Sequence, residues 1–245
     1  MEELKVKGIV LKSVDYKDSD KIVTIFSTEH GLIDARVRGV KKNKAKLTFA
    51  VQPFAFVEFI LVKSGNYYSC INATSIDQFF DITLDFDNYV FMLACLEVCL
   101  KTVKANDSQP ELFLLLLNAQ KAVCYDKING MYVFIKFMLE AMKILGYYFE
   151  TQNCPVCGEK ISGKEFLFSY DFNGVLCEKC AVQYNGLLIS KGEYTILNLI
   201  DTLEIDKLAN FKIMSRDDVI SVITLLIKDF RLLTGYEIES IKMFL

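Results

Sequence analysis

The chain has 245 residues, of which 52% are hydrophobic and 24% are charged, and its formal net charge is −3. This composition is that of a globular protein with enough apolar surface for real cores, in one large domain or two to three small ones. The longest apolar run, Leu112–Leu117, is too short to span a bilayer, and the N-terminus resembles neither a signal nor a transit peptide. We therefore expect a cytoplasmic protein with no membrane partner.

The charge is distributed unevenly along the chain. Residues 1–80 carry 12 Lys and Arg against 9 Asp and Glu, a net charge of +3. Residues 81–245 carry 16 against 22, a net charge of −6. The N-terminal third is therefore the better candidate for binding a polyanion.

Short β-rich runs separated by turn signals fill residues 1–80. The pattern predicts five strands, with a longer connection after the third: Val6–Lys12, Lys21–Ser27, Leu32–Val40, Phe54–Val62 and Tyr67–Ala73. The turn Glu29–Gly31 leads into the third of them. Five strands in this order fit a small closed barrel such as the OB-fold, so we assign residues 1–80 to an OB-fold domain.

The third predicted strand begins a basic stretch. Because side chains alternate along a strand, Ile33, Ala35 and Val37 are expected to face the core, which turns the arginines outward. Six basic residues and no acidic one lie between positions 36 and 46: Arg36, Arg38, Lys41, Lys42, Lys44 and Lys46. Such a dense run of like charge repels itself unless an anion screens it, and a phosphate backbone is the natural partner. The alternative is a solvated loop that keeps the protein soluble.

Binding of single strands also uses aromatic side chains, on which bases stack. Most phenylalanines of the N-terminal third occupy strand positions that suit the core. We therefore expect a stacking residue at Tyr67 or Tyr68. His30, the only histidine in the chain, is expected to be a surface turn residue.

The rest of the chain has mainly helical periodicity. Five helices are predicted: Leu84–Lys104, Pro110–Cys124, Met131–Leu145, Lys191–Leu203 and a last one from the N-cap Ser215 to about Leu233, which ends near Gly235. We assign residues 81–150 to a helical bundle and residues 186–245 to C-terminal helices that pack with it. A groove between such helices can accept an apolar peptide tail, but core packing is the default for their apolar faces.

Two C-x-x-C pairs lie between the two groups of helices. Cys154 and Cys157 are followed after nineteen residues by Cys177 and Cys180. This spacing predicts one tetrahedral Zn²⁺ site that is closed by four thiolates and therefore builds structure without catalysing. We assign residues 151–185 to a four-cysteine zinc finger, with Pro155, Gly158 and Gly174 at its turns.

Other uses of these cysteines fit less well. A redox dithiol is expected beside a βαβ pattern, iron–sulfur clusters use other spacings, and disulfides are unusual in a chain without an export signal. Within the zinc interpretation, a direct nucleic-acid reader is the alternative to a structural element. The other four cysteines, Cys70, Cys95, Cys99 and Cys124, lie among apolar neighbours and are expected to be buried thiols.

No catalytic constellation stands out. Gly158–Lys164 matches the beginning of a phosphate-binding loop, but Glu165 occupies the position that needs Ser or Thr. The chain has no H-E-x-x-H motif and no histidine cluster. We therefore expect a protein that is not an enzyme and has no small-molecule substrate.

Several stretches taken together resemble the RecO family of bacterial recombination mediators. They are Gly8–Ser13, Asp15–Val23, Phe26–Leu32 with the basic stretch after it, Gln52–Phe54, and Leu139–Tyr147 leading into Cys154–Cys157. The resemblance implies a multidomain α+β protein with an N-terminal OB-fold and a mainly helical domain with an inserted four-cysteine zinc finger. It also implies that the six basic residues form the DNA-binding surface of the barrel.

The same resemblance implies a role in DNA repair and homologous recombination by the RecF pathway. RecO proteins bind single- and double-stranded DNA, anneal complementary strands and contact the C-terminal tail of the single-strand-binding protein. With RecR they help to load RecA onto coated strands, which implies association with the nucleoid during repair. The alternative function is a zinc-ribbon regulator whose finger, with Lys160, Lys164 and Lys179, reads nucleic acid.

One stretch departs from the family pattern. Many RecO chains continue with basic residues after the glycine that ends the last helix, whereas this chain has Glu237 and Glu239 there. The departure favours the barrel over the C-terminal end as the DNA-binding surface.

Overall fold

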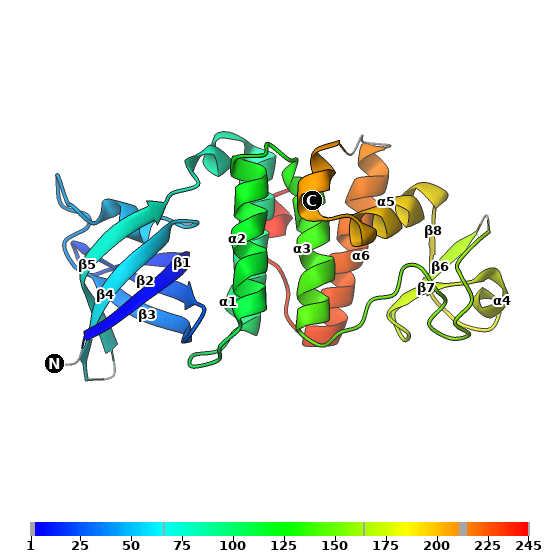
Figure 1. Ribbon diagram of the computed structural model, residues 1–245, viewed down its shortest axis with the longest axis horizontal. Helices are drawn as coiled ribbons and strands as arrows, with labels where there is room; N and C mark the ends of the chain where they lie inside the picture. Colours follow the sequence, from blue (N-terminus) through cyan, green and yellow to red (C-terminus); the bar gives the residue numbers. More distant parts are fainter. Residues whose placement is uncertain (1–2, 66, 164, 211–214, 245) are drawn as a thin grey trace.

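Three structural parts follow one another along the long axis of the molecule (Figure 1). The computed structural model describes residues 3–65, 67–163, 165–210 and 215–244. A closed five-stranded barrel lies at one end, α-helices form the middle, and a small three-stranded sheet with the paired cysteines lies at the other end. The expected α+β class, with an N-terminal OB-like barrel and a cysteine module inserted in a helical domain, is confirmed.

The barrel consists of β1 (Glu3–Tyr16), β2 (Asp20–Ser27), β3 (Gly31–Val37), β4 (Phe56–Ser64) and β5 (Tyr67–Asp77). The strands close in the order β1-β2-β3-β5-β4, with β3 and β5 parallel and the other pairs antiparallel. A one-turn 3₁₀-helix, Thr48–Val51, lies in the long connection after β3. This is the strand order of an OB-fold.

β1 is longer than the sequence pattern predicts. Its first half pairs with β4 and its second half with β2, and a bulge between Val10 and Lys12 joins the two halves. A bulge bends a strand and shifts its alternation, which interrupts the period-2 signal. Leu11 is consequently buried against the helices rather than in the barrel interior. β3 in turn ends at Val37, three residues before the predicted end.

The helical part contains α1 (Phe86–Thr102), α2 (Pro110–Cys124), α3 (Gly130–Ile144), α5 (Lys191–Thr202) and α6 (Arg216–Thr234). Three short 3₁₀-helices, Phe80–Leu84, Ile205–Asn210 and Ser240–Met243, complete it. Figure 1 shows α1, α2, α3 and α6 roughly side by side, with α1 and α2 next to the barrel. In the part of the chain that the structure describes, no helix is both long and apolar enough to cross a membrane.

The helix boundaries follow from local capping. The Ser215 side chain accepts a hydrogen bond from the Asp218 N–H, and Gly235 ends α6 with a φ of 77°. Both features match the prediction. The first helix begins two residues later than predicted, because the Asp85 side chain accepts from the Asn88 N–H and so caps α1 after the 3₁₀-turn.

Aromatic side chains join the barrel to the helices. The Phe113 ring of α2 lies 5.4 Å from Phe26 and 5.9 Å from Phe56, between ring centroids. The buried Gln120 amide donates to the Phe54 carbonyl at 2.7 Å. Several barrel phenylalanines are therefore buried in the interface with the helices, whereas Phe59 belongs to the barrel interior.

The loop after α1 supports the β2–β3 turn. Gly31 has a φ of +61°, and a Cβ there would meet the Lys104 carbonyl oxygen at 2.2 Å. The Leu32 N–H donates to the same carbonyl, and the Asn106 N–H donates to the carbonyl of His30. His30 itself lies in this turn with its side chain partly exposed.

Gly31→Ala is therefore expected to destabilise the junction between barrel and helices. A left-handed backbone costs a residue with a Cβ about 1–2 kcal/mol, and the clash with Lys104 adds to that cost. We expect the melting temperature to fall by about 5 °C or more. Gly65→Ala is the matched control, because Gly65 has a φ of +64° and a Cβ added to it would meet nothing within 4 Å. Equal losses in the two variants would contradict the proposed clash.

The cysteine module packs on the helices through aromatic stacking. It comprises β6 (Phe166–Ser169), β7 (Gly174–Leu176), α4 (Glu178–Ala181) and β8 (Leu187–Ile189), with the sheet order β7-β6-β8. Phe166 stacks on Tyr194 of α5 at 4.2 Å between centroids, and Phe168 stacks on Phe149 at 5.3 Å. The inner face of β6 thus belongs to the same apolar core as the helices.

Candidate nucleic-acid face and metal centre

The outward face of the barrel is built from cross-strand rows. Strand register places Val14, Ile22, Arg36 and Ser69 in one row across β1, β2, β3 and β5. The buried side chains of Ile33, Ala35 and Val37 point the other way, as predicted. The alternation of β3 therefore presents Arg36 to this face.

The six predicted DNA-binding residues differ in their surroundings. Arg36 is half-buried, and its Nε donates to the Asp20 carboxylate at 2.7 Å. The Lys41 ammonium lies 2.7 Å from the Asp15 carboxylate. Among the described residues, no ion pair is recorded for the other four, which are all exposed: Arg38, Lys42, Lys44 and Lys46. The structure thus supplies acidic partners for two of the six charges, which the sequence pattern did not anticipate.

Asp20 holds the basic stretch in place. Its carboxylate is buried and accepts hydrogen bonds from the Gly39 N–H at 2.8 Å and from Arg36. The Gly39 N–H, with Arg36 next, lowers the pKa of Asp20 to about 2. Similarly, the hydrogen bond from Lys41 lowers the pKa of Asp15. Asp20 is therefore ionised throughout the physiological pH range, and it fixes both Arg36 and the turn after β3.

Two residues of this face were missed in the sequence. Tyr16, at the end of β1, lies under the Arg36 guanidinium, 5.2 Å from ring centroid to Cζ. Lys17 follows it with a φ of 54° and an exposed side chain. Acidic residues flank both in the sequence, so the positive charge of Lys17 is not apparent from a count of charges along the chain. The only sequence signal for these two residues was their position at the turn between β1 and β2.

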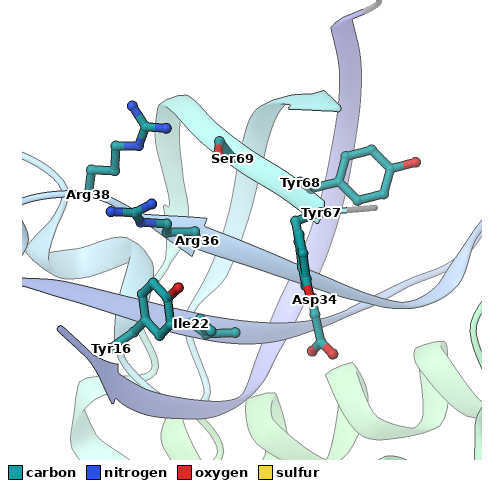
Figure 2. A pocket seen from close by; sticks show the side chains of 8 residues that line it. All are labelled: Tyr16, Ile22, Asp34, Arg36, Arg38, Tyr67, Tyr68 and Ser69. Carbon is teal, nitrogen blue, oxygen red and sulfur yellow. The ribbon is translucent and has the colours of Figure 1, made fainter. Parts of the chain in front are cut away.

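These residues border a hollow on the barrel face (Figure 2). Its volume is about 390 Å³, within the usual range of small-ligand sites. Figure 2 shows Ile22 between Tyr16 on one side and Tyr67 on the other, with Arg36 and Arg38 along one edge. The lining residues are Tyr16, Ile22, Asp34, Arg36, Arg38, Tyr67, Tyr68 and Ser69.

The two tyrosines expected to stack are arranged differently. The Tyr67 side chain is 74% exposed at the beginning of β5. Tyr68 is paired with the buried Ala35 of β3, and its partly buried side chain packs against the barrel core while it also borders the hollow. Both tyrosines line the hollow, and Tyr67 is the more exposed of the two.

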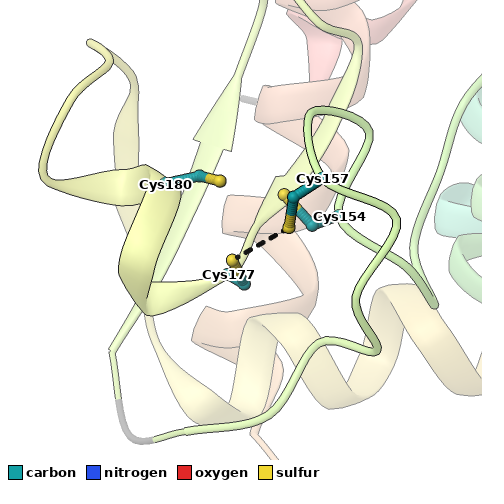
Figure 3. Close-up of side chains that lie close together, drawn as sticks. All are labelled: Cys154, Cys157, Cys177 and Cys180. Carbon is teal, nitrogen blue, oxygen red and sulfur yellow. Dashed lines mark hydrogen bonds between the residues drawn. The ribbon is translucent and has the colours of Figure 1, made fainter.

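The four paired cysteines converge at the far end of the molecule (Figure 3). Their sulfur atoms all lie within 4.8 Å of one another, and the Sγ atoms of Cys157 and Cys177 are 3.6 Å apart. The first pair lies in a knuckle in which the Gly158 N–H donates to the Cys154 carbonyl at 2.8 Å. The second pair begins α4, where Cys177 is the N-cap residue.

This donor set fits a tetrahedral metal ion. Four sulfur atoms at about 2.3 Å from Zn²⁺ lie about 3.8 Å apart, close to the separation of Cys157 and Cys177. A disulfide would need about 2.0 Å, and all four cysteines are free thiols. The four cysteines can therefore hold one metal ion, and four thiolates leave no position for a substrate.

Gly174 has a role other than the one predicted. It lies in β7, where a Cβ would meet the Glu150 carbonyl oxygen at 2.7 Å, so it permits close packing rather than a turn. Gly158 does occupy a turn, with a φ of +76°.

The structure also shows the positions of the remaining predicted features. Cys70, Cys95, Cys99 and Cys124 are buried, as predicted, and burial raises the pKa of each thiol. On the finger, Lys179 pairs with Glu159 at 3.0 Å, Lys160 is exposed, and Lys164 lies outside the described residues. After α6, Glu237 pairs with Arg231 and Lys242, and Glu239 pairs with Lys242.

Comparisons with known proteins cover both halves of the chain. A family model described as "Recombination protein O N terminal" matches residues 1–79, and one described as "Recombination protein O C terminal" matches residues 83–218. A DNA repair protein RecO from Clostridium novyi is 30% identical over 199 residues, 80% of this chain and 76% of that protein. A DNA repair protein RecO from Acetivibrio thermocellus is 28% identical over 87% of this chain and 85% of that protein. A DNA repair protein RecO from Thermoanaerobacter sp. is 25% identical over 94% of this chain and 93% of that protein.

Proposed function

Because this chain belongs to the RecO family of DNA repair proteins, we propose that it acts as a recombination mediator that binds DNA on its barrel. In this role it binds single- and double-stranded DNA and anneals complementary strands. With RecR it helps to load RecA onto strands coated by the single-strand-binding protein, whose C-terminal tail it contacts. The role requires no catalytic centre and no small-molecule substrate.

The observation that carries this proposal is the grouping of exposed cations beside a hollow of the barrel. Arg38, Lys42, Lys44 and Lys46 follow β3 within nine residues and have no recorded ion pair in the described chain. Unpaired cations release counterions from a phosphate backbone when they bind it, which makes them effective DNA contacts. Arg36 and Lys41 support the same surface but share their charge with Asp20 and Asp15.

The cysteine module has a structural role in the proposal. We infer that the resident ion is Zn²⁺, held by Cys154, Cys157, Cys177 and Cys180, since a set of four thiolates at this spacing is typical of structural zinc. The ion supplies folding free energy and no reactive position. Lys179 lies beside the site, and Glu159 offsets its charge. This pairing supports a structural role for the finger rather than recognition of nucleic acid.

Annealing of coated strands tests the function directly. Two complementary oligonucleotides, each covered with single-strand-binding protein, are mixed with and without this protein, and duplex formation is followed by fluorescence. We expect annealing to accelerate without ATP, because binding of both strands on a basic surface offsets their mutual repulsion. Binding of bare DNA with no acceleration would contradict the mediator role while leaving the DNA-binding surface in place.

A further inference from the structure

The hollow beside the basic residues is lined in part by aromatic and apolar side chains, which a groove that binds only phosphate does not need. Its two walls are the exposed rings of Tyr16 and Tyr67, which are 37% and 74% exposed, and Ile22 lies between them (Figure 2). Exposed aromatic rings on both sides of a hollow offer flat apolar surface to a ligand that enters it. Phosphate groups gain nothing from rings and an isoleucine, whereas the flat faces of a nucleobase do.

Arg36 also borders the hollow, and its planar guanidinium is held in a fixed orientation. Asp20 accepts from its Nε, and the guanidinium lies over the Tyr16 ring. The carboxylate offsets the positive charge of Arg36, so this arginine is poorly suited to phosphate. A guanidinium plane held in this way can stack on a base.

The two ends of the hollow differ in charge. A second hollow shares Arg36 and Arg38 with the first and adds Lys17, Lys42 and the backbone of Gly39 beside Asp18, Ser19 and the hydrogen-bonded Asp20. At the opposite end, next to Tyr67, Asp34 is exposed and accepts a hydrogen bond from Thr24. A phosphate is repelled by Asp34 and attracted by Arg38, Lys17 and Lys42.

We propose that the hollow between Tyr16 and Tyr67 is a binding site for one unpaired nucleobase, whose phosphate lies beside Arg38 and Lys42. This inference rests on the proposed DNA-binding function and names the form of DNA that the site selects. In a duplex each base is paired and stacked on its neighbours, so only a single strand can place a base between the two tyrosines. Duplex DNA contacts only the exposed cations, Arg38, Lys42, Lys44 and Lys46.

The test compares two single-stranded oligonucleotides with the same number of phosphates. One carries normal bases, and the other carries a run of abasic sites over the bound length. The full-length protein is expected to bind the normal strand about 5-fold to 150-fold more tightly, which is the usual contribution of one stacked base. Tyr67→Ala is expected to lose most of this ratio, and Tyr67→Phe to keep it, because stacking needs the ring and not the hydroxyl.

Three controls make the outcome specific. Tyr148→Ala removes a tyrosine of similar exposure, 69%, which lies beside the cysteine module, where the Asn173 amide donates to its carbonyl, and should not change DNA binding. Tyr67→Ala should leave the affinity for duplex DNA and the salt dependence unchanged. Equal affinity of the wild-type protein for normal and abasic strands, with salt-dependent binding of both, would overturn the base site and leave the proposed function standing. Absence of salt-dependent binding to any DNA would overturn the proposed function itself.

Discussion

Cys177→Ser is expected to abolish stoichiometric zinc binding and to unfold the cysteine module. Among the described residues, the buried members of the apolar cluster next to the four thiolates are Cys154, Leu167, Leu176 and Cys177. Even together with the contacts that β6 makes to the main apolar core, a cluster of this size cannot offset the conformational entropy of residues 151–185. Structural zinc contributes about 10–16 kcal/mol to the folding of such modules, and most of that contribution requires all four ligands.

The damage should spread into the helices but not into the barrel. Phe166 and Phe168 of β6 stack on Tyr194 and Phe149, so loss of β6 exposes part of the main apolar core. Hydrogen exchange measured by mass spectrometry should therefore become faster in β6, β7 and α5. The amides of β1–β5 are expected to keep their protection, because the barrel interior is a separate cluster.

A matched variant separates metal binding from the general cost of changing a buried cysteine. Cys70→Ser also replaces a buried thiol, which is 6% exposed and lies in the barrel. It should lower stability modestly and leave the zinc content at one ion per chain. If Cys177→Ser retained full zinc content, or if a chelator left the exchange pattern of β6 unchanged, the structural role of the metal would be wrong.

The second large effect concerns DNA. Replacing Arg38, Lys42, Lys44 and Lys46 together by glutamine should reduce the slope of log K against log salt by about 3, since each contact to a single strand contributes about 0.7. At low salt the affinity should fall on the order of a thousandfold by the same relation. Titration of a fluorescent single strand at several salt concentrations measures both quantities.

The control for this variant has the same change of charge elsewhere. Four exposed lysines of the helical part without a recorded ion pair in the described chain are replaced by glutamine: Lys121, Lys191, Lys207 and Lys228. This variant should keep nearly the wild-type slope, because these side chains lie away from the barrel face. Similar losses in the two variants would indicate binding spread over the whole molecule and would contradict a site on the barrel.

Local sequence patterns were sufficient to predict most of the secondary structure. Alternation predicted the five strands and the inward side of β3, and the capping residues Ser215 and Gly235 predicted the limits of α6. Prediction failed where local order is interrupted. The bulge in β1 shifted its alternation, and the 3₁₀-turn before α1 carries a helical signal that is not part of the helix. Both are short irregularities that propensity and periodicity average over.

The candidate sites also contain features that local sequence predicts and features that it does not. Four cysteines at metal-binding spacing are recognisable from sequence because thiolates have few other uses in such pairs, and the folded chain brings all four together. The six basic residues are equally visible as a run. Their acidic partners are not, because Asp20 and Asp15 precede Arg36 and Lys41 by 16 and 26 positions, and strand pairing alone makes them neighbours.

Local patterns along the chain identify the succession of strands and helices, the four cysteines that can hold a metal and the location of excess positive charge, since each depends on neighbouring residues. Which of those charges have acidic partners, how exposed each tyrosine is and which phenylalanines join the barrel to the helices depend on contacts between distant parts of the chain. Closure of the barrel sets these properties, because it brings Tyr16, Arg36 and Tyr67 from three different strands to one face. Contacts between distant strands carry no local signal, and it is these contacts that form the proposed base site.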